Sequence, residues 1–554
     1  MSPSYPFYFK RLSILLGLKF VALAAFIIAG VIGLAPDEAQ YWTWSQALDF
    51  GYYSKPPGIA WQIWLGTQAF GQNEFGVRFI TLLLGALQAG AVFLLAANAG
   101  LKPKICFWVG VIMAFTPLGI LGSVLAITDG GMLLFWTFAS VSLVSALRQG
   151  KEANPLVIGS CIMAGALFKW PIYFFWIFYL ICWRLYFPQQ KLLQIVQGIA
   201  VSLVGLLPSV WWNWTHDWAT FRHVSSTLQG GQGHASGNFW AFFGSQAVLV
   251  SPLLFVILLI SFFAWFKQRK RVAPPIFYCG LVSLSCLGGA LMFSLFQKVQ
   301  GNWVFFAYPT AFTLMGWKMN EWGKPLLWTT FLISSERPFG CKEASVKDRF
   351  LAIAKAIPSS RSLTSTSFRS AGSCDEITKI ALLWVKAGVF LSIVAAGLFL
   401  LIPLPPAMNP FKHNQGWKAL AQALTKNGYE PQKNYLISDK YQTTSLLSFY
   451  APEQKRAFFL NLQGIRHNQY SYWPGLETQD KQATGYFVWV ENYPYLKNLE
   501  AKKVFYVQEL QNYFKEVAFV AYEPLRIYGE DVTKAALLFK CKDCYHLPEE
   551  TSAW

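Results

Sequence analysis

The sequence predicts a polytopic α-helical membrane protein that ends in a small C-terminal α/β domain. Of its 554 residues, 54% are apolar and 13% are charged, whereas soluble proteins usually carry about 25% charged residues. Apolar runs near the ~20-residue length of a membrane-spanning helix recur between residues 12 and 403. After Pro403-Leu404-Pro405-Pro406 the composition becomes that of a soluble protein. We therefore expect a transmembrane domain over residues 1–404 and a second domain over residues 405–554.

About 11 apolar runs qualify as spans, with juxtamembrane helices on the outer side. They cover roughly residues 12–34, 77–99, 105–126, 130–147, 156–169, 171–187, 193–213, 239–266, 274–296, 303–318 and 380–403. Lys169-Trp170-Pro171 separates two short runs, which predicts a tight turn at one membrane face. Residues 325–334 are too short to span. Residues 335–378 carry many Ser, Lys and Arg residues, and we expect a cytoplasmic insert there.

Basic clusters set the orientation of the chain. They occur on alternate loops, from Lys10-Arg11 to the run around Lys267–Arg271, and the positive-inside rule assigns those loops to the cytoplasm. We therefore expect a multi-pass protein of the plasma (inner) membrane with a cytoplasmic N-terminus, retained as a span rather than cleaved as a signal peptide. Residues 35–76, residues 214–238 and the C-terminal domain then face outward. The net charge of +18 does not indicate nucleic-acid binding, because the basic residues are dispersed and form no single face.

Short strand-like and helix-like segments alternate in the C-terminal domain. The strand-like runs lie at residues 435–437, 457–460, 485–490 and 517–520, and the helix-like segments lie at 415–426 and 441–450. This alternation is typical of a small α/β domain. Cys541 and Cys544 form one Cys-x-x-Cys sequence, for which a local disulfide or two unpaired thiols are both better explanations than a metal or redox site.

Asp37 and Glu38 are the strongest candidates for chemistry. They follow the first apolar run directly, where ionisable groups are costly to place and are candidate functional residues. The alternative is that they only favour the start of a juxtamembrane helix. Lys55, which Pro56-Pro57 follows, lies in the same outer loop. A carboxylate base and a fixed cation in one loop suit group transfer from a phosphate-bearing donor.

Other polar residues are expected at the same membrane face. Asp129 begins the fourth span, where it could also be an ordinary helix cap. Arg222 and His223 precede a Gly-rich stretch at residues 230–233, which suggests a flap over a site, and Lys169 and Asn302 lie in other outer loops. Each of these residues alone could simply solvate a loop. Because the chain has only six His residues, any divalent ion would have to rely on carboxylates.

The ordered set of motifs resembles bacterial glycosyltransferase family 39, the polyprenyl-phosphate-sugar-dependent enzymes akin to protein O-mannosyltransferases and the aminoarabinose transferase of lipid A. The resemblance covers nearly all of the chain apart from residues 335–378. The matching stretches are Pro36-Asp37-Glu38-Ala39-Gln40-Tyr41-Trp42, Gly51-Tyr52-Tyr53-Ser54-Lys55-Pro56-Pro57, Phe75-Gly76-Val77-Arg78, Thr128-Asp129, Phe168-Lys169-Trp170, Ser251-Pro252, Gly301-Asn302-Trp303, Tyr308-Pro309, Asp439-Lys440-Tyr441-Gln442 and Arg466-His467-Asn468-Gln469-Tyr470.

The resemblance implies a fold of the GT-C type and a role for individual residues. Asp37 would deprotonate or orient the acceptor, Glu38 would support it, and Asp129 would be the second carboxylate of the site. Lys55 would contact the donor phosphate, and we place Arg222 beside it. We assign substrate contacts to five residues: Tyr41, Tyr53, Lys169, His223 and Asn302. The aminoarabinose transferases commonly place a Glu before the Lys-Pro, where this chain has Ser54, so no metal ligands are assigned.

These expectations describe an inverting glycosyltransferase with Asp37 as the base. It would move a sugar from a polyprenyl-phosphate donor to a lipid, glycan or protein acceptor at the outer membrane face. No cofactor is assigned, and a divalent metal is left open. The alternative is a transporter or flippase of lipid-linked sugars, which predicts inverted repeats and helices broken near the midplane. A third reading is a non-catalytic binding or assembly protein that acts through its C-terminal domain.

Overall fold

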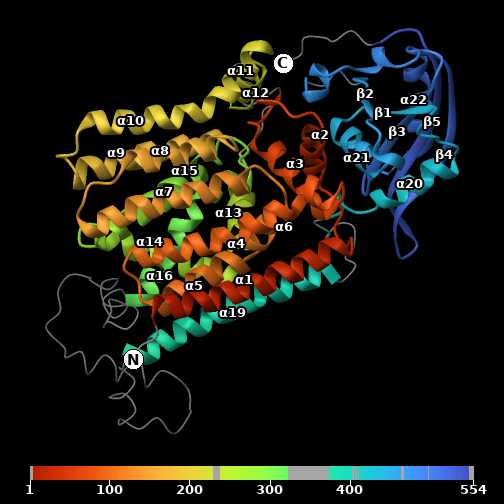
Figure 1. Ribbon diagram of the computed structural model, residues 1–554. Coiled ribbons are helices and arrows are strands. Elements are labelled where there is room, and N and C mark those ends of the chain that lie inside the picture. Colours follow the sequence, from red (N-terminus) through yellow and green to blue (C-terminus); the bar gives the residue numbers. More distant parts are fainter. Residues whose placement is uncertain are drawn as a thin grey trace, which may run out of the picture.

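The chain folds into a helical bundle with a mixed α/β domain at one end (Figure 1). The computed structural model describes residues 4–228, 237–321 and 374–547, except 402–404, 406–408, 410, 463, 465, 466 and 497. Of the expected insert at 335–378, only residues 374–378 are described, and they begin a helix. The α/β domain lies at the end of the bundle opposite the N-terminus (Figure 1).

The bundle is built from helices of very unequal length. They are α1 (Tyr5–Ile28), α2 (Pro36–Ser45), α3 (Gly58–Phe70), α4 (Glu74–Asn98), α5 (Pro103–Phe115), α6 (Pro117–Val124), α7 (Asp129–Gln149), α8 (Pro155–Ala166), α9 (Phe175–Tyr186), α10 (Leu192–Leu203), α11 (Leu207–Thr215), α12 (Ala219–Leu228), α13 (Phe239–Val250), α14 (Pro252–Gln268), α15 (Pro274–Phe293), α16 (Tyr308–Glu321) and α19 (Cys374–Leu401). Short 3-10 turns, η1 (Trp170–Phe174), η2 (Val204–Leu206) and η3 (Gly301–Ala307), precede α9, α11 and α16.

The polytopic membrane fold is confirmed, with fewer complete spans than the sequence predicts. In the described residues, five helices are long and apolar enough to cross a membrane, or up to seven if each bent pair counts as one span. Several expected spans fold as helices that are too short to cross alone: α8 and α9 have 12 residues each, and α16 has 14. The turn predicted at Lys169-Trp170-Pro171 is the break between α8 and α9.

Two of the expected spans are sharply bent. The run at 105–126 divides into α5 and α6, which meet at 58° where Pro117 follows the extended residue Thr116. The run at 239–266 divides into α13 and α14, which meet at 106° at Ser251-Pro252. Proline has no N–H to continue a helical hydrogen-bond ladder, so both bends leave carbonyl groups that need other partners.

The C-terminal domain is built on a five-stranded sheet with the order β2-β1-β3-β5-β4. The strands are β1 (Asn434–Ser438), β2 (Phe458–Phe459), β3 (Thr484–Asn492), β4 (Phe514–Tyr528) and β5 (Asp531–Cys544), and the helices are α20 (Trp417–Lys426), α21 (Tyr441–Tyr450) and α22 (Leu499–Gln511). β1 is parallel to β2 and β3, whereas β5 is antiparallel to β3 and β4. Cys541 and Cys544 are free thiols.

One hydrophobic core joins the two domains. It includes Leu34, Tyr41 and Trp44 of the bundle together with Trp417 and Leu447 of the α/β domain. Helix α2 packs along α21 at this junction, where the rings of Trp42 and Phe449 meet edge-to-face at 4.9 Å. The α/β domain therefore lies directly over the segment that carries the first two candidate carboxylates.

Candidate active site

Asp37 is the accessible carboxylate of the site. It lies in the first turn of α2, which Pro36 starts, and its side chain remains exposed to solvent. Protein still surrounds it closely enough that burial raises the pKa of its carboxyl group. The positive charge of Lys55 acts in the opposite direction and Glu38 adds a smaller upward effect on that pKa. Asp37 is thus a carboxylate of enhanced basicity beside a cation, a combination that suits a general base.

Lys55 is presented by a tight turn. The backbone N–H and C=O groups of Tyr52 and Lys55 pair with each other at 3.1 and 3.3 Å, so residues 52–55 form a closed hairpin-like turn. After Pro56-Pro57, the N–H of Gly58 donates to the carbonyl of Leu167 at 2.7 Å. A Cβ on residue 58 would approach that same carbonyl oxygen at 2.7 Å, so a glycine is needed here. This contact holds the Lys55 turn against the end of α8 and next to Lys169.

Glu38 has a different environment from its neighbour, because successive residues of a helix point about 100° apart. It is fully buried and forms an ion pair with fully buried Arg78 of α4, with oxygen–nitrogen distances of 2.6 and 2.8 Å. Its two oxygens also accept the N–H groups of Ala35 and Ala126, each at 2.9 Å. Arg78 donates further to the carbonyls of Ile32 and Gly33. This geometry favours a positioning role for Glu38, which the sequence assigned to the catalytic group.

Asp129 forms the second focus of the site. It occupies the first position of α7 and is 3% exposed. Its two oxygens accept separate bonds, one from the Lys169 ammonium at 2.7 Å and one from the Asn302 amide at 3.2 Å. Three residues that the sequence placed in three different loops therefore meet here. The two donors fix the carboxylate plane, and Lys169 balances its charge.

Tyr53 and His223 form a third group that includes the C-terminal domain. Their rings lie 5.0 Å apart, and the ring of Tyr472 lies 6.0 Å from Tyr53 on the other side. The backbone N–H of Tyr53 donates to the Gln469 side chain at 2.7 Å. Arg222, next to His223 on α12, has an exposed side chain. The α/β domain thus contributes Gln469 and Tyr472 to the wall of the site.

Tyr41 connects these groups. It lies one helical turn after Asp37 on α2 and is 6% exposed. Burial raises the pKa of its hydroxyl well above the ordinary value, and the nearby charges of Asp37 and Asp129 raise it further, as does Tyr441 of the α/β domain. The phenol therefore stays protonated at neutral pH and can donate a hydrogen bond between the two carboxylates.

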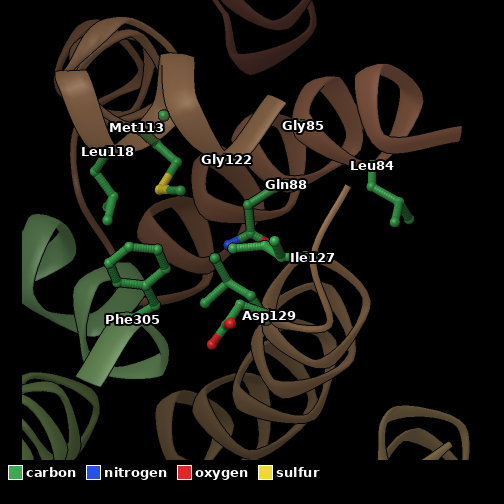
Figure 2. A pocket seen from close by; sticks show the side chains of 12 residues that line it. Leu84, Gly85, Gln88, Met113, Leu118, Gly122, Ile127, Asp129 and Phe305 are labelled. Atoms are coloured by element: carbon green, nitrogen blue, oxygen red, sulfur yellow. The ribbon is translucent and has the colours of Figure 1, made fainter. Parts of the chain in front are cut away.

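Asp129 lines a mostly apolar cavity in the bundle, and Figure 2 shows the side chains around it. Its volume is about 30 Å³, and its wall includes Leu118, Gly119 and Gly122 of α6 and Phe305 of η3. Gln88 of α4 is the other polar side chain at the cavity, and its amide N–H donates to Thr137. Asp129 therefore stands between a polar site at the domain junction and an apolar interior.

The residues present do not fit a divalent metal. Among the described residues, no three His, Cys, Asp or Glu side chains gather in a way that could hold an ion. Glu38 is committed to Arg78 and Asp129 to Lys169, which leaves Asp37 as the carboxylate with open oxygens. Ser54 stands where a further Glu would add a ligand.

Sequence reasoning missed several residues of this site. Arg78 was recognised only as part of a motif, although an Arg in an apolar run is a signal in itself, because a buried charge needs a partner. Gln469 was likewise recognised only as part of a motif, and Tyr472 carries no signal. Their contribution depends on how the two domains pack, which the sequence pattern does not report.

Comparisons with known proteins agree with this picture. Residues 54–212 match the family described as Dolichyl-phosphate-mannose-protein mannosyltransferase. The chain is 30% identical over 298 residues to the lipid A galacturonosyltransferase RgtD of Rhizobium johnstonii. This alignment covers 52% of this chain and 62% of RgtD. Over 111 residues it is 32% identical to the undecaprenyl phosphate-alpha-4-amino-4-deoxy-L-arabinose arabinosyl transferase 2 of Pseudomonas fluorescens, covering 18% of this chain and 20% of that protein.

The fold is that of a solved transferase. Crystal structures of ArnT from Cupriavidus metallidurans, in the apo state and bound to undecaprenyl phosphate, match with TM-scores of 0.56 and 0.55. They cover 95% and 94% of this chain and 97% of each ArnT chain, at 14% identity. The GT-C fold and the resemblance to family 39 are confirmed. The chain matches less than two thirds of the length of RgtD.

Proposed function

We propose that this protein is a membrane glycosyltransferase that moves a sugar from a polyprenyl-phosphate donor to a lipid acceptor, with inversion at the anomeric carbon. The observation that carries the proposal is the pairing of Asp37, an exposed carboxylate of raised pKa, with Lys55 at the junction of the bundle and the α/β domain. The name of RgtD supports lipid A as the acceptor, and the name of the arabinosyl transferase supports a polyprenyl-phosphate donor.

The proposed mechanism is a single displacement. Asp37 accepts the proton of an acceptor hydroxyl as its oxygen forms a bond to the anomeric carbon. The bond between that carbon and the phosphate oxygen breaks, and the phosphate leaves with the bonding electrons towards Lys55 and Arg222. A positioned base contributes typically about 10²–10⁴-fold to such a rate, and fixed cations stabilise the leaving charge.

Asp129 and Tyr41 orient the sugar in this proposal. The Asp129 carboxylate is held by Lys169 and Asn302, so it presents fixed acceptor lone pairs towards the site. Tyr41 supplies a hydrogen-bond donor between the two carboxylates. Tyr53 and His223 offer ring surfaces beside the Lys55 turn. The membrane orientation follows from the basic loops: the N-terminus is cytoplasmic, and the site and the α/β domain face outward from the inner membrane.

A transporter of lipid-linked sugars remains the second candidate, and the two bent helix pairs are the observation that favours it. Purified protein in liposomes separates the two functions. The liposomes would carry undecaprenyl-phosphate-linked galacturonic acid or 4-amino-4-deoxyarabinose together with lipid A, and mass spectrometry would follow modified lipid A. Transfer by the wild type and its loss in Asp37→Asn supports the transferase. Translocation of donor that persists in Asp37→Asn without any transfer by the wild type supports the transporter.

A further inference from the structure

Lys19 is a buried cation that the proposed mechanism does not use. It lies in the middle of α1, a 24-residue span, and is 9% exposed. Its ammonium contacts three oxygens of the bent pair α5–α6: the carbonyls of Ala114 at 2.7 Å and Gly119 at 3.0 Å, and Ser123 Oγ at 2.8 Å. An ionisable group inside a membrane bundle is costly, and such groups usually have a function.

The hydrogen-bond directions show that all three protons of the ammonium are used. Ser123 has a single hydroxyl proton, which it donates to the Gly119 carbonyl at 2.6 Å. The Ser123 oxygen must therefore accept from Lys19, as the two carbonyls do. The cation also lies at the C-terminal end of α5, where the helix dipole favours positive charge. Lys19 thus gives a donor to Ala114 at the end of α5 and two donors to α6, and so links the two helices across the bend at Pro117.

The segment that Lys19 holds leads directly to the site. Gly119 and Gly122 of α6 line the cavity behind Asp129. At the far end of α6, the N–H of Ala126 is bound by Glu38, and only two residues separate Ala126 from Asp129. Lys19 fixes the start of this segment and Glu38 fixes its end. A shift of α6 would move Asp129 relative to Lys169 and Asn302.

We propose that Lys19 is a positioning residue of the transferase site: it holds the α5–α6 bend and thereby sets where Asp129 stands. The inference rests on the proposed function, because it assigns the effect of Lys19 to a site residue. Lys19→Met should lower the rate of sugar transfer by roughly 100-fold, the loss expected for a misplacement of about 1 Å. Ser123→Ala removes one of the three acceptors and should cost about fivefold. Lys10→Met, an exposed lysine on the same helix, is the matched control and should transfer at the wild-type rate.

The decisive readout is the combination with Asp129→Asn. If Lys19 acts through Asp129, Lys19→Met should reduce the rate of Asp129→Asn by less than about twofold, since residues that act through one shared backbone shift are coupled. If the two losses multiply, Lys19 serves only general stability and the inference fails. Full activity of a folded Lys19→Met protein would also overturn it. Should Lys19→Met not fold, the same cycle with Ser123→Ala decides in the same way.

A measurement that needs no activity separates this inference from the proposed function. Hydrogen exchange of the purified proteins should be faster over residues 117–131 in Lys19→Met than in Lys10→Met, and unchanged over α3. Unchanged exchange over residues 117–131 would refute the positioning role. A wild-type protein that transfers no sugar would refute the proposed function and would leave this result standing.

Discussion

Replacing Glu38 by Gln is the sharpest test of how the site is held. The carboxylate receives four N–H groups, two on each oxygen: Arg78 and Ala126 on one, Arg78 and Ala35 on the other. A glutamine keeps one of the two acceptor oxygens. Its amide nitrogen replaces the other oxygen and is itself a donor, so it faces two of the four N–H groups without accepting from them. Two buried donors then lose their acceptor, which costs about 1–3 kcal/mol each. Arg78, which is fully buried, also loses its counter-charge.

These contributions agree with the 3–5 kcal/mol or so that is typical when one partner of a buried ion pair is removed, a figure that already includes them. We expect Glu38→Gln to lower the melting temperature in detergent by several degrees and Arg78→Met to do the same. The double variant should be less destabilised than the sum of the two, because an apolar replacement leaves no lone charge. Thermal melts of the four proteins check this. A Glu38→Gln protein with wild-type stability and greatly reduced transfer would refute the reasoning and make Glu38 a chemical participant.

Three further predictions concern Asp37, Lys534 and Gln469. Burial raises the pKa of Asp37 in the folded state, so the stability of the wild type falls as pH rises above 3.8, the ordinary pKa of Asp. Asp37→Asn should therefore melt at a higher temperature than the wild type at pH 7. Wild-type transfer should decline as pH falls through the raised pKa of Asp37. Burial lowers the pKa of Lys534 from its ordinary value of 10.5 to about 7 in the folded state. The free energy of unfolding should therefore rise between about pH 7 and 10.5, where the unfolded chain binds the extra proton. Thermal melts of Lys534→Met over this range should lack that rise. Gln469→Ala removes the acceptor of the Tyr53 N–H and should raise the KM for the donor about fivefold without unfolding the protein, as measured by steady-state kinetics and melting.

Much of the fold could be predicted because it depends on local patterns. The length of the apolar runs predicted the membrane domain. The change to a soluble composition after Pro403 predicted the α/β domain. Strands β1 to β3 lie close to the predicted runs, whereas the run predicted at 517–520 is only a short part of β4. β5 was missed because Ala535-Ala536-Leu537-Leu538 has the composition of a helix; its burial in the middle of the sheet overrides that preference. The 106° bend at Ser251 was missed because the apolar pattern continues through it.

The sequence predicted which membrane face several candidate residues share, but it did not predict how their side chains are arranged. Asp129, Lys169 and Asn302 come together as expected of residues at one membrane face. In the sequence, nothing distinguishes the carboxylate of Asp37 from that of its neighbour Glu38. The structure separates them, because α2 points Asp37 outward and Glu38 into the packed interface with α4. Such a difference depends on tertiary packing, as does the bond between Gln469 and Tyr53, which lies 416 residues earlier in the chain.

The central claim is that Asp37 is the base of a sugar transfer, and one rate tests it most directly. Single-turnover transfer from an undecaprenyl-phosphate-linked sugar to lipid A would be measured for Asp37→Asn and for Asp217→Asn, an exposed carboxylate between α11 and α12. We expect Asp37→Asn to lose about 10²–10⁴-fold in rate while Asp217→Asn keeps the wild-type rate. Equal rates for Asp37→Asn and the wild type would contradict the account.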